Sequence, residues 1–207
     1  MTVKWSAFSA GSAIAGADEN VGLQGGANVR WTWSQALTYF SGAVATLTNK
    51  TLTAPGGVFY VLAASAATGR SVTTGTTETV LATVTIPANA VGANGVIRIT
   101  ALWTYTNSAN SKTVRVRLGG LSGTSFGSAV ATTTADLQLM YMIRARNSTS
   151  SQIGFAANAA ASFQTTVTSP ATGSVNMAVA QDLVFTGTTA LSGETITLES
   201  YIVEILN

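Results

Sequence analysis

The chain has 207 residues, of which only 9% are charged, and its formal net charge is +2. It contains no cysteine and no histidine, which excludes disulfides, thiol nucleophiles, Ser-His-Asp triads and metal sites built from nitrogen or sulfur ligands. The small net charge argues against a nucleic-acid partner, and the sequence lacks the run of about 18 apolar residues that a membrane-spanning helix needs. We expect no cofactor. Low charge with abundant Thr and Ala favours β-structure whose faces are largely buried between subunits.

Residues 1–45 are rich in aromatic side chains but are poorly suited to folding alone. A segment of about 40 residues rarely builds its own core without a disulfide, a metal or a partner. Buried aromatic side chains are the usual anchors of protein interfaces. We therefore expect residues 1–45 to form an anchoring arm, with packing against the downstream domain as the alternative. The predicted anchors are Trp5, Phe8, Trp31, Trp33, Tyr39 and Phe40.

Local patterns divide this arm further. Asp18 to Asn28 is rich in glycine and asparagine and reads as a turn region, and Val29 to Trp33 predicts a short strand. Thr32 or Ser34 is a plausible N-cap for a short helix over 35–40. Residues 46–57 read as a connector that ends in Pro-Gly-Gly.

Beyond residue 58 the apolar residues recur with a period of two. Eight or nine short strands with turn signals every 8–12 residues predict an antiparallel β-sandwich or jelly roll over 58–207. The predicted strands are Thr79–Ile86, Val96–Tyr105, Thr113–Leu118, Phe126–Thr133, Leu137–Arg146, Ser151–Ala156, Ser162–Thr168, Val175–Phe185 and Glu194–Leu206.

Alternation within two of these strands suggests surfaces. Val114, Val116 and Leu118 share a face that we expect to be internal, with Lys112 among the polar residues on the other side. The candidate surface contacts are the outward basic residues Arg115, Arg117, Arg144 and Arg146. They are equally suited to bind acidic groups of a partner or to pair with Glu199 and Glu204 across a subunit boundary.

The strand around Met140 is apolar on both faces. Met140 and Met142 alternate with Leu139 and Tyr141, and a strand of this kind is usually buried twice, once in its own sandwich and once in an oligomer. We expect these four residues to contribute to a homotrimer interface.

Two motifs near the N-terminus resemble parts of tailed-phage structural proteins. Gly16-Ala-Asp18, Gln24-Gly-Gly26 and Thr32 fit the spacing G-x-D/E-x5-Q-G-G-x5-T of a short N-terminal phage module. Leu47-Thr-Asn-Lys-Thr-Leu-Thr-Ala-Pro55 resembles the L-T-N-K-T-L-x-x-P connector of tail-fibre and fibre-like proteins. This resemblance implies a virion protein, assembled in the bacterial cytoplasm, that contacts a tail, baseplate or major capsid protein.

The second half carries a similar resemblance. The strand patterns around Thr77-Glu-Thr-Val, Gly95-Val-Ile-Arg, Lys112-Thr-Val-Arg and Gly193-Glu-Thr-Ile look like a β-sandwich at the distal end of phage fibres and spikes. Such domains are typically trimeric, which is what the resemblance implies here.

Together these features predict a non-enzymatic appendage, a short fibre whose sandwich contacts a host-surface glycan or protein. The alternative is a capsid decoration or head-fibre protein on the major capsid shell. A polysaccharide depolymerase is a minority alternative because paired carboxylates can hydrolyse glycosides, and Asp136, Asp182 and Glu194 would then be the first candidates. The polar loops Thr104–Ser111 and Asn147–Gln152 are candidate contact surfaces.

Overall fold

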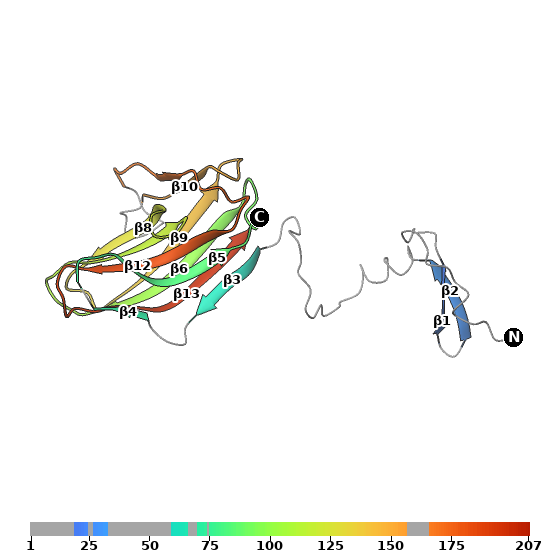
Figure 1. The fold of residues 1–207 in the computed structure, drawn as a ribbon, viewed down its shortest axis with the longest axis horizontal. Helices are drawn as coiled ribbons and strands as arrows, with labels where there is room; N and C mark the ends of the chain where they lie inside the picture. The colour runs from blue at the N-terminus through green and yellow to red at the C-terminus, as the bar shows by residue number, and fades with distance from the viewer. Residues whose placement is uncertain (1–18, 25–26, 33–58, 66–69, 74, 157–165) are drawn as a thin grey trace. The chain divides into compact units, whose positions relative to one another are not determined.

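The computed structural model describes residues 19–24, 27–32, 59–65, 70–73, 75–156 and 166–207. The chain divides into two compact units, Met1–Thr51 and Leu52–Asn207. All the regular structure in the described ranges is β-strand (Figure 1). The all-β prediction is therefore confirmed, while the short helix predicted over 35–40 lies outside the described residues.

The described part of the first unit is an antiparallel hairpin. Strand β1 (Glu19–Gln24) pairs with β2 (Ala27–Thr32) in a register that sets Gln24 beside Ala27. The region predicted as a turn up to Asn28 thus forms most of a hairpin, and this part of the expectation was wrong. Apolar residues such as Val21 and Leu23 alternate only weakly with small residues, so the sequence pattern did not indicate a strand here. Backbone pairing in a hairpin does not require such alternation.

The second unit is a sandwich of two antiparallel sheets. Its strands are β3 (Phe59–Ser65), β4 (Arg70–Val72), β5 (Thr79–Ile86), β6 (Val96–Tyr105), β7 (Lys112–Leu118), β8 (Thr124–Ala131), β9 (Asp136–Ala145), β10 (Gln152–Gly154), β11 (Ala171–Gly173), β12 (Gln181–Thr189) and β13 (Ile196–Leu206). One sheet has seven strands in the order β11-β10-β9-β6-β13-β3, with β4 also pairing β13, and the other has four in the order β5-β12-β7-β8.

This strand order is that of a jelly roll. The eight strands β4 to β9, β12 and β13 form the two four-stranded halves β4-β13-β6-β9 and β5-β12-β7-β8, the double-sheet arrangement of two Greek keys. The last two strands lie inside their sheets: β12 lies between β5 and β7, and β13 lies between β6 and the β3–β4 edge. The predicted sandwich is therefore confirmed, with jelly-roll connectivity.

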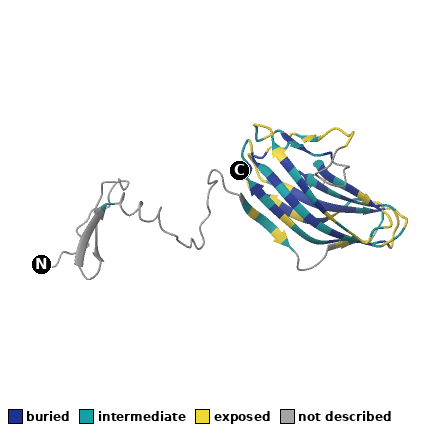
Figure 2. Ribbon diagram, turned by 180° about the vertical axis from the view of Figure 1, so that it is seen from behind, coloured by how far each residue is buried: buried dark blue, intermediate teal, exposed yellow. Residues whose placement is uncertain are grey.

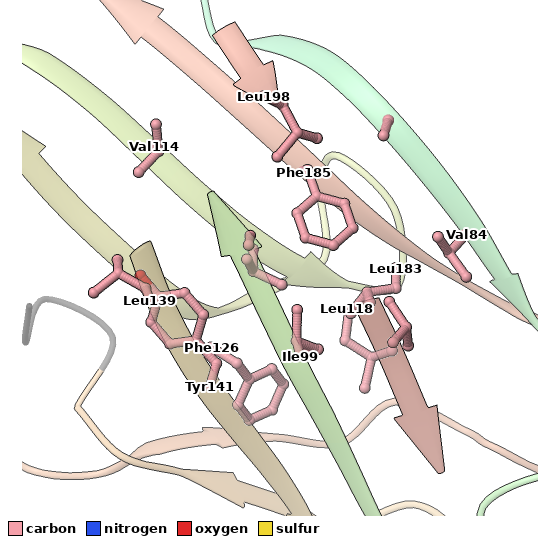
Figure 3. Packing of buried hydrophobic residues seen from close by; sticks show 14 of the residues in the cluster. Val84, Ile99, Val114, Leu118, Phe126, Leu139, Tyr141, Leu183, Phe185 and Leu198 are labelled. Atoms are coloured by element: carbon pink, nitrogen blue, oxygen red, sulfur yellow. The ribbon is translucent and has the colours of Figure 1, made fainter. Parts of the chain in front are cut away.

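The core fills the space between the sheets. Along β6 the buried residues alternate strictly with partly exposed ones, an alternation visible along the strands in Figure 2. Figure 3 shows side chains of both sheets pointing toward one another, among them Ile99 from the seven-stranded sheet and Leu118 and Phe185 from the four-stranded sheet. Phe185 stacks on Tyr201, with ring centroids 4.8 Å apart.

Several predicted strand limits differ from those observed. The strand predicted at 175–185 is β12 at Gln181–Thr189, and residues 174–180 are irregular. The described end of the strand predicted at 162–168 is not a strand, and the short β11 follows it at Ala171–Gly173. β3 and β4, for which no limits were predicted, complete the edge of the larger sheet.

The two ends of the sandwich are formed by different parts of the chain. At one end lie the connections 75–78, 106–111, 132–135 and 190–195, which we call the four-loop end. At the other end, which we call the terminal end, Leu206 of β13 lies beside Phe59, where β3 begins. The chain therefore joins the sandwich at the end opposite the four loops.

Candidate interaction surfaces

The four-loop end is held together by a buried lysine. The side chain of Lys112 is fully buried. Its Nζ donates to Ser108 Oγ at 2.9 Å and to the Asn110 carbonyl at 2.7 Å, and it lies 3.7 Å from Glu194 Oε2. The expectation that Lys112 lies on the polar face was wrong: at the first position of β7 it is in phase with Val114 and points into the sandwich.

Glu194 completes this group from the connection between β12 and β13. Its Oε1 accepts hydrogen bonds from the Ser108 hydroxyl and from Asn110 Nδ2, the latter at 2.9 Å. These bonds, with the nearby Lys112 ammonium, hold the pKa of Glu194 below its usual value. The group, which we call the lysine staple, joins the connections 106–111 and 190–195 across 86 residues of sequence between Ser108 and Glu194.

Backbone hydrogen bonds reinforce the same end. Thr106 N–H donates to the Thr195 carbonyl at 3.0 Å, and Thr195 N–H donates back to Thr106 Oγ1 at 2.8 Å. Ala190 N–H donates to the Ser111 carbonyl at 2.9 Å. Connections tied in this way lose little conformational entropy on binding, which favours them as a contact surface.

The outer face of the four-stranded sheet is polar, and two of its basic residues pair with one carboxylate. Glu78 accepts two hydrogen bonds from the Arg117 guanidinium, both at 2.8 Å, and one from Thr186 Oγ1 at 2.5 Å. Arg115 Nη1 lies 3.6 Å from the same carboxylate. The hydrogen bond from Arg117 is the main reason why the pKa of Glu78 is lowered, and the pairing raises the pKa of Arg117.

The four arginines predicted as two outward-facing basic rows lie on the two different sheets. Arg115 and Arg117 lie on β7 and use Glu78 as their partner, rather than Glu199 or Glu204. Arg144 lies on β9 of the other sheet, exposed, with Nη2 3.1 Å from Met142 Sδ. Arg146 follows β9 and is exposed. Glu78 could not be identified as the partner from the sequence, because it lies outside the strands, in the connection that precedes β5.

The outer face of the seven-stranded sheet is much more apolar. Strand pairing aligns its outward residues in rows that run across β3, β13, β6 and β9. One row is Val61–Glu204–Arg98–Met142, and the next is Ala64–Ile202–Thr100–Met140. We call these two rows the apolar face.

An ion pair lies in the middle of this face. Arg98 Nε and Nη2 donate to the Glu204 carboxylate at 2.6 and 2.7 Å. The bidentate pair raises the pKa of Arg98 and lowers that of Glu204, in each case chiefly through these hydrogen bonds. On both sides of it stand apolar side chains, of which Val61 is 55% and Ile202 42% exposed.

The four residues predicted for a trimer interface divide between two environments. Leu139 and Tyr141 are buried in the core between the sheets, where they are not accessible to another molecule. Met140 and Met142 lie on the outer face in the rows just described, half-buried. The strand is thus apolar on both sides, and only the two methionines are placed to meet a partner.

The predicted anchors lie in the first unit. Trp31 is part of β2, where its backbone pairs with Asn20. Trp5, Phe8, Trp33, Tyr39 and Phe40 lie outside the described residues.

The two polar loops proposed as contact surfaces lie at opposite ends of the sandwich. Residues 106–111 belong to the four-loop end, while Ser148 N–H donates to the Ala93 carbonyl at the terminal end, at 3.0 Å. Thr104 is still within β6, and its hydroxyl donates to Glu199 at 2.5 Å.

The described residues offer no constellation of metal ligands: no three His, Cys, Asp or Glu side chains gather there. None of the described segments is a helix of the length and apolarity needed to cross a membrane. The candidate carboxylates divide between the two ends of the sandwich. Asp136 and Glu194 lie at or beside the four-loop end, whereas Asp182, the second residue of β12, lies at the terminal end and accepts from Thr85 Oγ1 at 2.8 Å.

Comparisons with known proteins give distant structural similarities. No family model and no curated protein sequence matches the chain. The CBM2 module of the evolved Dit of Lactobacillus casei BL23 phage J-1 is similar over 59% of this chain and 67% of that one, at 10% identity and a TM-score of 0.31. Structures of infectious bursal disease virus strains Gx and Gt are similar at 12% and 11% identity, with TM-scores of 0.28 and 0.29.

Both virus matches cover 79% of this chain but less than half of the viral chain, 45% and 46%. TM-scores near 0.3 are too low to support a functional argument.

Proposed function

We propose that the protein is a non-enzymatic structural protein of a tailed-phage virion: a short homotrimeric fibre that residues 1–45 anchor and whose sandwich is displayed for host contact. The N-terminal motifs and the aromatic arm support the anchoring role, and residues 46–57 serve as the connector. The observation that carries the display role is the direction of the fold. The sandwich begins with Phe59 at the terminal end, beside Leu206, so the four-loop end is at the opposite end of the strands from the point where the chain enters the sandwich.

The displayed end is suited to binding rather than to chemistry. Its loops are fixed by the lysine staple and by backbone bonds, and they carry polar residues such as Asn107 and Asn110 on an ordered frame. Catalysis of glycoside hydrolysis would need two carboxylates about 5–10 Å apart on one substrate. Glu194 is buried and bonded to Ser108 and Asn110, and Asp182 lies at the other end, which supports a non-catalytic role.

A site-specific label on purified virions tests the proposal. Because the chain has no cysteine, Ala109→Cys at the exposed tip of the 106–111 connection gives a single thiol for a maleimide–gold particle. Gold at the tip of a tail appendage is the expected result. Gold over the head would support the alternative, a capsid decoration or head-fibre protein. Absence of the protein from purified virions would reject a structural role of either kind.

Incubation with purified host surface polysaccharide tests the absence of catalysis. We expect no new reducing ends, with or without a chelator. Release of reducing ends that Asp136→Asn abolishes would instead support the depolymerase.

A further inference from the structure

We infer that the apolar face of the seven-stranded sheet is where copies of this chain meet, and that they meet in a ring, with the β9 side of one copy against the β3–β13 side of the next. This inference rests on the proposed homotrimer and specifies its contact. In the apolar face, apolar side chains of β3, β13 and β9 lie in two adjacent rows, around the Arg98–Glu204 pair and Thr100.

The two outer faces of the sandwich differ in composition. The four-stranded sheet presents Glu78, Arg115 and Arg117 in an ion-paired group, and its exposed valines, Val80 and Val130, lie on its two edge strands. The apolar face presents methionine, isoleucine and valine on both sides of one ion pair. Exposed apolar side chains that gather on one face of a domain are typical of an interaction site.

The charges inside the apolar face are already paired. The two charged groups inside the apolar face, Arg98 and Glu204, already satisfy each other through two hydrogen bonds of 2.6 and 2.7 Å. A buried ion pair is tolerable when it is bidentate and costly when one partner is missing. The face therefore requires no compensating charge from a partner, and a second copy of the same neutral face satisfies it.

The direction of the rows is compatible with a ring of copies. Rows lie perpendicular to the strands, so rotation about an axis parallel to the strands keeps each row at one height. Each row is apolar at its two ends, Met142 and Val61 in one, Met140 and Ala64 in the other. In a ring, the methionine end of a row meets the Val61 or Ala64 end of the same row in the neighbour, which is a closed heterologous contact.

Cysteine cross-linking tests this arrangement on the full chain. Val61 and Met142 are separated by β13 and β6, hence by three strand spacings or about 14 Å, and a disulfide cannot bridge Cα atoms more than about 7 Å apart. Since the chain has no native cysteine, any disulfide in the double variant Val61→Cys/Met142→Cys joins two copies. Mild oxidation should give a covalent trimer of three 21.1 kDa chains on a non-reducing gel.

The matched control is Val80→Cys/Val130→Cys, whose positions lie on the two edges of the other sheet, also with two strands between them. It should remain uncross-linked. The single variants Val61→Cys and Met142→Cys should each give at most traces of dimer, because a ring brings unlike positions together. Strong dimer from Met142→Cys alone would indicate a two-fold contact and overturn the ring.

A second measurement covers variants that assemble poorly. Ile202→Lys places a charge at an exposed position of the face, and Val130→Lys places one on the opposite sheet. Light scattering should show that Ile202→Lys raises the concentration of half-dissociation at least about 10-fold, with Val130→Lys unchanged. Equal behaviour of the two variants, or an absence of cross-links, would reject the inference. The presence of the protein in virions is measured separately, so a failed interface leaves the proposed virion role distinguishable.

Discussion

Gly127 on β8 lies directly against the ring of Tyr141 on β9, on the opposite sheet. A Cβ atom added to Gly127 would lie 2.7 Å from the ring carbons Cε1 and Cζ, well inside van der Waals contact. The two sheets approach closely at this point because one of the facing residues has no side chain.

We predict that Gly127→Ala destabilises the sandwich by about 1–3 kcal/mol, because the Tyr141 ring must move within a packed core. Urea unfolding followed by circular dichroism measures the change. Ser128→Ala, on the neighbouring outward position, is the control and should change stability by less than about 0.5 kcal/mol. A Gly127→Ala protein as stable as the control would contradict the close approach.

Tyr141→Phe should have the opposite outcome. The Tyr141 hydroxyl is buried without a hydrogen-bond partner among the described residues, and burial raises its pKa. Removing an unpaired buried hydroxyl is expected to leave stability unchanged or to raise it by up to about 1.5 kcal/mol. A clear loss of stability in the same urea assay would show that the hydroxyl is satisfied.

The lysine staple predicts a large effect from a residue that looks like an ordinary surface lysine in the sequence. Lys112→Met leaves the buried Glu194 carboxylate without its cation, so we expect the thermal midpoint to fall by at least about 5 °C. Arg115→Met on the same strand should change it by less than half as much, because Arg117 still pairs with Glu78. If the double variant Lys112→Met/Glu194→Gln recovers part of the loss, the unpaired charge of Glu194 is the cause.

The thermal midpoint should fall at acid pH and should not vary with pH around neutrality. The pKa values of Glu78, Glu194 and Glu204 all lie below the usual 4.5 in the folded protein. A group with a lowered folded pKa contributes stability that is complete above its unfolded pKa and is lost as the pH falls through the folded value. With no histidine in the chain, the midpoint should be flat from about pH 5.5 to 8 and should fall below about pH 4.5.

Thermal melts across this range check the prediction, with Glu78→Gln as the informative variant. Its midpoint should be lower at pH 7 and should fall less steeply in acid, because one of the three carboxylates with a lowered pKa is gone. An identical acid slope would show that the Glu78–Arg117 pair does not contribute.

The Gln152 side chain should hold residues 171–177 in place at one edge of the sandwich. Its buried side-chain amide donates to the Val175 carbonyl at 2.8 Å and accepts from Val175 N–H at 2.9 Å, as a neighbouring strand would. Gln152→Ala leaves both backbone groups unpaired, at a cost of about 1–3 kcal/mol. Hydrogen exchange at residues 171–177 should accelerate at least about 10-fold, while amides of β6 stay protected.

Gln181→Ala is the matched control for this change. The Gln181 amide also reaches the same region, where it donates to the Asn176 carbonyl at 2.8 Å, but that bond is exposed. Water can replace an exposed hydrogen bond, so exchange at residues 171–177 should change little in this variant. Equal acceleration in the two variants would show that the burial of Gln152 is not what orders the region.

Deletion of residues 1–57 tests the proposed division of labour. Because the first unit is separate from Leu52–Asn207, we expect residues 58–207 to keep a cooperative β-rich melt and to lose incorporation into particles. Among single changes in the arm, Trp31→Ala and Trp33→Ala should reduce incorporation most, since an aromatic anchor at an interface is worth about 2–4 kcal/mol. Normal incorporation of the shortened protein would place the anchor elsewhere.

Period-two patterning made the sandwich predictable where one face of a strand is buried. Val96–Tyr105 was predicted at its observed limits because apolar and polar residues alternate along it without a break. The pattern failed in β12, where Val184 and Thr186 on the outer side are as buried as Phe185 on the inner side. A strand covered on both faces shows no alternation, so its limits were misplaced by several residues.

The surfaces were less predictable than the core. Local sequence showed that Met140 and Met142 face away from Tyr141, but the row partners Val61 and Ile202 come from strands 60 or more residues away. The pairing of Glu78 with Arg117 and of Glu194 with Lys112 likewise depends on long-range strand order. A charged residue in one strand does not reveal which distant carboxylate will reach it.

The interior positions of β12 and β13 also bear on how the protein is made. These strands come from the last 27 residues of the sequence, Gln181 to Asn207, yet each lies between strands that leave the ribosome much earlier. Until they are synthesised, β5 and β7 have no strand to join them, and β6 lacks its partner on one side. Closure must therefore wait until β12 and β13 have been synthesised, and before that the nascent chain exposes open strand edges that favour aggregation. Copies can meet through the finished seven-stranded sheet only once β13 has joined it, so the folding of each subunit precedes assembly.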